Sequence, residues 1–146
     1  MSLRLAEPQD YPIVKEMLLK FIESTPYSHY DVDPTKLDEL ILGLAALGKE
    51  EAIILCATED DQVVGMLAAR ATEFLFNRNK IASEMAWWVE PGYRRHGIEL
   101  KKAFEYWAEK IGAKYNSMSS LNTEKVNRYL VRDGYRMTEC TFVKEI

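Results

Sequence analysis

Residues 84–98, EMAWWVEPGYRRHGI, contain the change of pattern that decides the fold. The apolar run up to Val89 predicts a strand, and the Pro91-Gly92 pair predicts its end. Apolar residues at helical spacing then continue through residues 97–110. The sequence therefore predicts a strand, a short turn and the N-terminus of a helix in direct succession.

Such a turn has the properties of an anion site. Main-chain N–H groups at a helix N-terminus have no partner within the helix, and the helix dipole adds positive potential. Gly97 would let a phosphate approach the main chain, while Arg94 and Arg95 add charge and donors. A surface turn with two arginines would explain each residue taken singly. The ordered strand–Pro–Arg–Gly–helix pattern favours a pyrophosphate site.

The flanking sequence predicts a mixed sheet with helices on its faces, in one domain over residues 1–146. Strands are predicted at residues 3–5, 52–58, 63–73, 81–89 and 115–118, and helices at residues 11–23, 34–47, 97–110 and 123–132. The alternation of residues 135–144 predicts one or two further strands at the C-terminus.

Composition excludes several classes of protein. The net charge of −4 and the pI of about 5.3 provide no clustered basic surface, so we expect no nucleic-acid partner. No apolar run approaches the roughly 18 residues that span a membrane, and the N-terminus does not resemble a signal peptide, so the cytoplasm is the expected location. The spacing of His29, His96, Cys56 and Cys140 predicts no metal site and two free thiols.

The stretch resembles the acetyl-CoA-binding motif of the acyl-CoA N-acyltransferase (GNAT) superfamily. That motif is a strand ending in Val, then a Pro, then (Arg or Gln)-x-x-Gly-x-(Gly or Ala) at the start of a helix. Val89, Pro91, Arg94 and Gly97 match it, whereas Glu99 replaces the last small residue with a carboxylate. The hairpin DDQVVGML and the late stretch VNRYLVRDGY extend the resemblance over nearly the full length.

The resemblance implies the α/β fold of that superfamily, with a central, mostly antiparallel mixed sheet flanked by helices. It also implies a parallel strand pair that splays apart at the cofactor site. The implied activity is transfer of an acetyl group from acetyl-CoA to a primary amine of a small molecule or a protein. Homodimers are common in the superfamily, and nothing in the sequence decides that point.

The same resemblance assigns the cofactor-binding residues. Main-chain groups of Trp88 and Val89 would pair with the pantetheine arm like an added strand, and the N–H of Val89 would stabilise an oxyanion. The complete set is Trp88, Val89, Arg94, Arg95, His96, Gly97, Ile98, Glu99 and Asn122. For Asn122, capping of the last helix is the alternative role.

Glu84 is the candidate general base, because the superfamily often has a glutamate early in this strand. Simple alternation would place Glu84 on one face with Ala86 and Trp88. Burial in an apolar strand would raise the pKa of the carboxyl toward the range useful for proton transfer. The alternative is a solvated glutamate, or one paired with Arg70 or Lys80.

The candidate proton donor does not fall on the position that the resemblance indicates. The superfamily's tyrosine position, four residues before Gly134, is occupied by Leu130. Tyr129, one position away, is the candidate donor, and half-buried packing is the alternative.

In the loop after the first helix, the resemblance places the amine substrate near aromatic and acidic side chains that suit an ammonium group. The candidates are Tyr27, Tyr30 and Asp31. An ordinary polar loop with Asx turns is the alternative there. For the whole chain, the alternative is a GNAT-like acyl-CoA-binding or scaffold module that has lost catalysis, which Glu99 and Leu130 favour.

Overall fold

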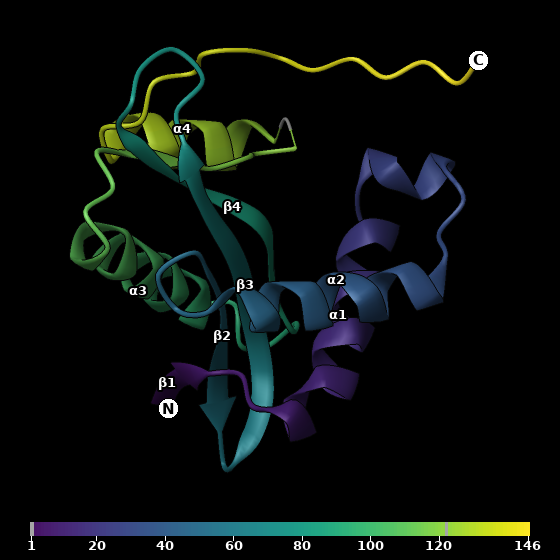
Figure 1. The fold of residues 1–146 in the computed structure, drawn as a ribbon. Helices are drawn as coiled ribbons and strands as arrows, with labels where there is room; N and C mark the ends of the chain where they lie inside the picture. The colour runs from purple at the N-terminus through teal and green to yellow at the C-terminus, as the bar shows by residue number, and fades with distance from the viewer. Residues whose placement is uncertain (1, 122) are drawn as a thin grey trace.

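A five-stranded sheet, in the order β1-β2-β3-β4-β5, forms the centre of the molecule (Figure 1). The computed structural model describes residues 2–121 and 123–146. Its helices, with η marking a 3-10 helix, and its strands are β1 (Ser2–Leu5), η1 (Pro8–Asp10), α1 (Tyr11–Glu23), η2 (Pro26–His29), α2 (Pro34–Leu47), β2 (Ala52–Glu59), β3 (Gln62–Glu73), β4 (Lys80–Val89), α3 (His96–Lys110), β5 (Tyr115–Ser117) and α4 (Glu124–Arg132).

Strand directions confirm the predicted mixed and mostly antiparallel sheet. Strands β1 to β4 pair antiparallel with their neighbours, while β4 and β5 pair in parallel. The parallel register runs from Ile81 opposite Tyr115 to Ser83 opposite Ser117 and ends there, although β4 continues to Val89. Beyond Ser83, therefore, the outer edge of β4 has no strand partner in the described chain.

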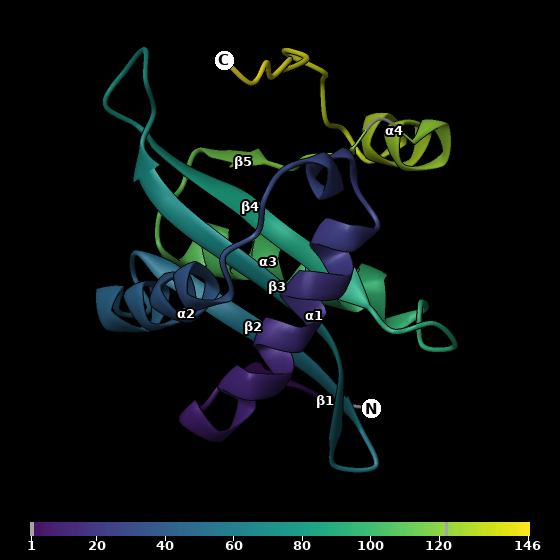
Figure 2. The same ribbon diagram turned by 90° about the vertical axis from the view of Figure 1, so that its right-hand side faces the viewer.

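Helices cover both faces of the sheet, and each face has its own core. Helices α1 and α2 lie across one face, and α3 lies behind the other (Figure 2). The first core joins α1 and α2 to alternate residues of the sheet that include Ile54, Met66 and Ala86. The second joins Leu100 and Phe104 of α3 to the intervening residues. This two-sided burial explains why β2 and β3 are continuous apolar runs.

Local sequence signals set the boundaries of the elements. Helix α2 begins after Asp33, whose side chain accepts a hydrogen bond of 2.9 Å from the Thr35 N–H, and it ends at Gly48 with a positive φ of 82°. Every predicted helix and every strand up to β5 is present, with ends displaced by at most one residue or so. No helix in the described chain has the length and apolarity needed to cross a bilayer.

The predicted C-terminal strands are wrong. Residues 135–146 form no helix or strand and extend along the surface from α4 (Figure 1). Tyr135 is anchored, since its N–H donates to the Leu130 carbonyl at 2.9 Å, but Phe142 is 92% exposed. Alternation predicts a strand only where a neighbouring strand and a core surface receive it, and this segment meets neither.

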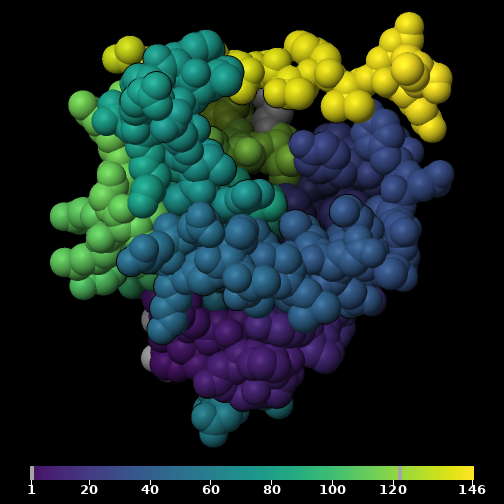
Figure 3. Space-filling model, in the orientation of Figure 1, coloured from purple at the N-terminus to yellow at the C-terminus, as the bar shows by residue number. Residues whose placement is uncertain are grey.

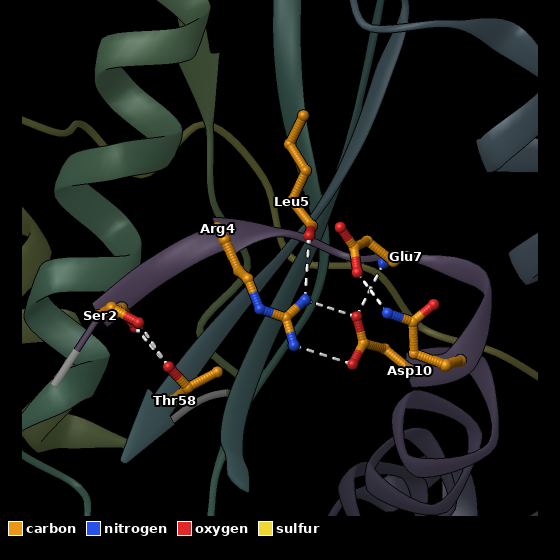
Figure 4. A network of polar contacts seen from close by, with 7 residues as sticks. Ser2, Arg4, Leu5, Glu7, Asp10 and Thr58 are labelled. Atoms are coloured by element: carbon orange, nitrogen blue, oxygen red, sulfur yellow. Dashed lines mark hydrogen bonds and ion pairs between the residues drawn. The ribbon is translucent and has the colours of Figure 1, made fainter. Parts of the chain in front are cut away.

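An ion pair joins β1 to the start of α1 (Figure 4). Arg4 donates through Nη1 and Nη2 to the two carboxylate oxygens of Asp10 at 2.6 and 3.0 Å, and the Glu7 N–H donates to Asp10 at 2.7 Å. The hydrogen bonds from Arg4 lower the pKa of Asp10 against the opposing effect of burial. Asp10 is thus a buried carboxylate whose hydrogen-bond donors and compensating cation come from residues close by in the sequence.

Candidate active site

A β-bulge in β4 determines where the candidate base points. Opposite β3, Ala86 pairs with Ala68 and Glu84 pairs with Ala69, so Met85 is an extra residue without a partner. Glu84 and Ala86 consequently lie on opposite faces of the sheet. The prediction from simple alternation, which placed them on one face, is wrong because a bulge is not visible as a break in the apolar pattern.

Glu84 lies one residue beyond the end of the parallel pairing, and only 7% of its surface is exposed. One carboxylate oxygen accepts a hydrogen bond of 3.2 Å from the Ser119 N–H. Burial raises the pKa of Glu84 to about 7, and the bond from Ser119 opposes this only partly. A carboxyl that titrates near neutral pH is suited to accept and release a proton.

The alternative ion pair of Glu84 does not form in the described chain. Lys80 instead donates to the carbonyl of Ile111 at 2.9 Å, and the side chain of Arg70 is exposed. Glu84 therefore remains a buried acid whose charge no cation compensates.

The turn after β4 uses part of the predicted amide cradle for its own folding. The N–H of His96 donates to the Tyr93 carbonyl at 2.9 Å, and the N–H of Gly97 donates to the Arg94 carbonyl at 3.1 Å. By contrast, the N–H groups of Arg94 and Arg95 have no backbone partner among the described residues. The remaining anion site consists of these two amides and the first turn of α3. It is smaller than the sequence predicted, because the amides of His96 and Gly97 are used within the turn.

Charged side chains around this turn are already engaged. The guanidinium of Arg94 lies 4.6 Å from the centre of the Trp88 ring. Arg95 donates to both carboxylate oxygens of Glu59 at 3.0 Å, and Nε2 of the buried His96 lies 2.6 Å from the same carboxylate. The role of Glu59 as a partner of Arg95 is not visible in the sequence, because 36 residues separate the two and no local pattern links them.

The structure revises the expected roles of Gly97 and Glu99. A Cβ added at Gly97 would lie 3.4 Å from the Trp87 ring, an ordinary van der Waals distance, so the packing of α3 on β4 does not itself require glycine here. Glu99 is a partly exposed side chain, 3.7 Å from the ammonium of Lys102, and Ile98 is 44% exposed. Repulsion of a phosphate by Glu99 is reduced by this ion pair.

Tyr129 lies beside, not on, the buried face of α4. Leu130 is the buried residue of this helix, with 7% of its surface exposed. The Tyr129 ring lies 5.4 Å from the ammonium of Lys101, a side chain of α3. The position of Leu130 shows why the superfamily's tyrosine position cannot supply a donor here, and Tyr129 remains a candidate.

Lys101 joins α3 to α4 and the C-terminal segment. Its side chain is 1% exposed, and its ammonium pairs with Glu105 at 2.7 Å and with Asp133. The Tyr135 ring lies 5.1 Å away, and the Tyr135 hydroxyl donates to Glu105 at 3.1 Å. Burial lowers the pKa of Lys101, but the hydrogen bonds that its ammonium donates to Asp133 and Glu105 outweigh burial and raise the pKa. This network fixes the helix that carries Tyr129.

The candidate substrate loop borders a hollow in the surface. Figure 3 shows this hollow between the C-terminal segment and the connection from α1 to α2, with α4 at its floor. The Tyr30 hydroxyl donates to the Val143 carbonyl at 3.4 Å, while Tyr27 is half exposed. Asp31 is exposed, and the neighbouring Asp33 serves as the helix cap that the alternative predicted. Asn122 lies outside the described residues.

Sequence and structure comparisons agree on the relationship of this chain. Residues 14–132 match the model of the acetyltransferase (GNAT) family. The chain belongs to the GNAT family. Membership supports acyltransferase activity, and it leaves the acceptor of the acyl group undefined. A comparison with curated proteins found no match.

Several solved GNAT acetyltransferases have a similar fold. A putative acetyltransferase from Agrobacterium tumefaciens superposes with a TM-score of 0.77 at 17% identity over 100% of both chains. The aminoglycoside 6'-N-acetyltransferase of Acinetobacter haemolyticus gives 0.74 at 20% identity over 100% of this chain and 99% of that one. The glucosamine-6-phosphate N-acetyltransferase of Arabidopsis thaliana gives 0.75 at 14% identity, covering 99% and 97%. At such identities the likeness shows the fold alone.

Two groups of unsatisfied donors suit the cofactor that the GNAT family generally uses. The free N–H groups of Arg94 and Arg95 lie at the start of α3, where a pyrophosphate would accept from them. The Nε1 of Trp88 is buried and has no hydrogen-bond partner in the described part of the chain. Because a buried donor without a partner destabilises a protein, a bound acceptor at this position would be favourable.

Proposed function

We propose that the protein is an N-acetyltransferase that transfers an acetyl group from acetyl-CoA to a primary amine of a small molecule or a protein. The observation that carries the proposal is Glu84, a buried carboxyl with a pKa of about 7 at the point where β4 and β5 part. Among the described residues, no ion pair accounts for its burial. Proton transfer at neutral pH is a role that needs such a group.

Each part of the site has a distinct task in this proposal. The main-chain N–H groups of Arg94 and Arg95, which have no backbone partner among the described residues, bind the diphosphate. The unpaired outer edge of β4 at Trp88 and Val89 binds the pantetheine arm, as a strand would. Bound acetyl-CoA supplies the acetyl group as an activated thioester.

Proton movements are assigned to two side chains. An amine attacks only when neutral, so Glu84 accepts its proton during the attack. The N–H of Val89 donates to the developing oxyanion, and Tyr129 returns a proton to the leaving thiolate.

Cofactor binding is tested by thermal unfolding. A ligand at 100 times its Kd stabilises the folded state by about 2.7 kcal/mol, which should raise the Tm by roughly 5–10 °C for a chain of this size. Pantetheine, which lacks the diphosphate, is the matched control and should give a much smaller rise. Equal shifts, or none at millimolar acetyl-CoA, would contradict the assignment of the turn.

Turnover is tested by the release of coenzyme A with a panel of primary amines. We expect release above the rate of spontaneous hydrolysis for at least one amine. Stabilisation by acetyl-CoA without any release across the panel would instead favour the binding module without catalysis.

A further inference from the structure

An apolar cavity of about 180 Å³ lies between α1, α2 and the sheet. In Figure 2 these two helices cross the same face of β2, β3 and β4, and residues from all five elements line the space. Leu18 and Ile41 line it from the helices, while Ala68, Met85 and Ala86 line it from the sheet. Every lining residue is apolar, so no side chain around the cavity carries a charge.

A space of this size is unusual in a protein interior. Cores pack at the density of organic crystals and contain few voids larger than a water molecule. Apolar cavities of about 150 Å³ stay dry and bind benzene or xenon. The cavity described here therefore has the volume and the polarity for an aromatic ring or a branched aliphatic group.

The cavity lies directly behind the candidate base. Met85 and Ala86, which line it, are the two residues that follow Glu84, and the bulge at Met85 turns Glu84 toward the opposite face. Beyond Ser83 no strand covers the outer edge of β4 in the described chain. To reach the Glu84 carboxylate, a molecule held in the cavity would have to pass around this open edge.

The acceptor amine suits this cavity better than the acyl group of the cofactor does. Phe21, near the end of α1, lines the cavity and leads into η2, on the side of the hollow. The turn at Arg94 and Arg95, which suits the diphosphate, starts α3 on the other face of the sheet. The acceptor would thus approach β4 from the side of α1 and meet the cofactor at the open edge of the strand.

We propose that this cavity binds a compact apolar group of the acceptor, so that the enzyme acetylates hydrophobic primary amines in preference to small ones. The proposal rests on the proposed acetyltransferase activity. It defines the substrate class by an aromatic or branched aliphatic group attached to the primary amine.

The first experiment compares methylamine, isobutylamine and 2-phenylethylamine as acceptors. We expect kcat/KM to rise at least tenfold from methylamine to 2-phenylethylamine. Ala68→Leu fills the cavity and should abolish most of this rise, while the KM for acetyl-CoA stays unchanged. Equal kcat/KM for all three amines, or an unaltered rise in Ala68→Leu, would overturn the proposal.

Stability separates filling of the cavity from general damage. Ala68 and Ala57 are both buried alanines of the sheet, but Ala57 belongs to the core on the α3 face and does not line this cavity. We expect Ala68→Leu to keep or raise the Tm and Ala57→Leu to lower it by overpacking. If Ala68→Leu unfolds, Leu44→Phe on α2 fills the same space from the helix side.

Binding of toluene gives a readout that needs no turnover. We expect toluene to shift the NMR signals of the Ala68, Met85 and Ala86 methyl groups in the wild-type protein and not in Ala68→Leu. Absence of these shifts overturns the cavity site even if the protein acetylates amines. Toluene binding without turnover of any amine overturns the proposed function and the acceptor assignment with it. A preference for isobutyryl-CoA over acetyl-CoA that Ala68→Leu removes would reassign the cavity to the acyl group.

Discussion

Asp10 and Glu84 are both buried carboxylates, yet their surroundings have opposite effects on them. Asp10, 5% exposed, accepts hydrogen bonds from Arg4 and from the Glu7 N–H, which lower its pKa (Figure 4). Glu84, 7% exposed, accepts one from the Ser119 N–H, and burial raises its pKa to about 7. Burial alone therefore does not mark a functional carboxylate.

The two carboxylates differ in the effect that their negative charge has on the stability of the fold. The ion pair of Asp10 joins β1 to α1 and stabilises the fold. A carboxyl without a cation, by contrast, makes the folded state less stable once it ionises, and such a cost is typical of functional sites. Substitutions of Glu84 and Asp10 test that contrast.

The largest expected effect is the loss of turnover in Glu84→Gln. Glutamine keeps the size and the acceptor for Ser119 but cannot accept the proton of the amine. We expect kcat at pH 7.5 to fall about 10²- to 10⁴-fold, measured by release of coenzyme A, with little change in the KM for acetyl-CoA. Asp10→Asn should leave kcat within about twofold at a temperature where both proteins are folded.

Glu73→Gln is the matched control, because Glu73 is an exposed carboxylate at the end of the neighbouring strand. Its kcat should equal that of the wild type. A similar loss in Glu73→Gln, or full activity in Glu84→Gln, would remove Glu84 as the base.

The second effect is on stability against pH. Because the folded pKa of Glu84 exceeds the unfolded value of 4.5, the folded protein binds the extra proton between pH 4.5 and about 7, and stability falls as the pH rises through this window. The shift corresponds to roughly 3 kcal/mol. Urea unfolding should therefore find Glu84→Gln close to the wild type at pH 5 and more stable at pH 8. A constant difference across this range would contradict the raised pKa.

The smallest effect is the stability change in Asp10→Asn, and it has the opposite dependence on pH. Since the folded pKa of Asp10 is lowered, the ion pair contributes above the unfolded pKa of 3.8 and is lost as the pH falls through the folded pKa. The Arg4 side chain is 37% exposed, so we expect a loss of only about 1–3 kcal/mol at pH 7. The two proteins should converge in urea unfolding as the pH falls below 3.8 and through the folded pKa of Asp10, and a cost that persists once Asp10 is protonated would point to lost packing instead.

Sequence patterns predicted most of the fold because apolar spacing and helix caps act locally. The cap at Asp33 and the stop at Gly48 are examples, since each depends on its immediate neighbours. The strand predicted in residues 135–144 failed because pairing requires a receiving edge, which no local pattern specifies.

For the site, the sequence identified Glu84 but not its direction. The bulge at Met85 adds one residue against β3, and neither the composition nor the alternation of β4 reveals it. The contacts of Glu59 were not predicted for a related reason. They join the end of β2 to Arg95 and His96 at the start of α3, and these elements are distant in the sequence. The resemblance to the GNAT motif indicated the turn, and only the structure shows which of its amides lack a backbone partner among the described residues.

The most direct test is an NMR titration of the side-chain carboxyl carbons in the wild-type protein, with Asp10 as the internal reference. We predict that Glu84 titrates near pH 7, while Asp10 titrates below 3.8. A Glu84 carboxyl that titrates at 4.5 or lower would contradict the account, since the carboxylate would then lack the proton affinity that its role requires.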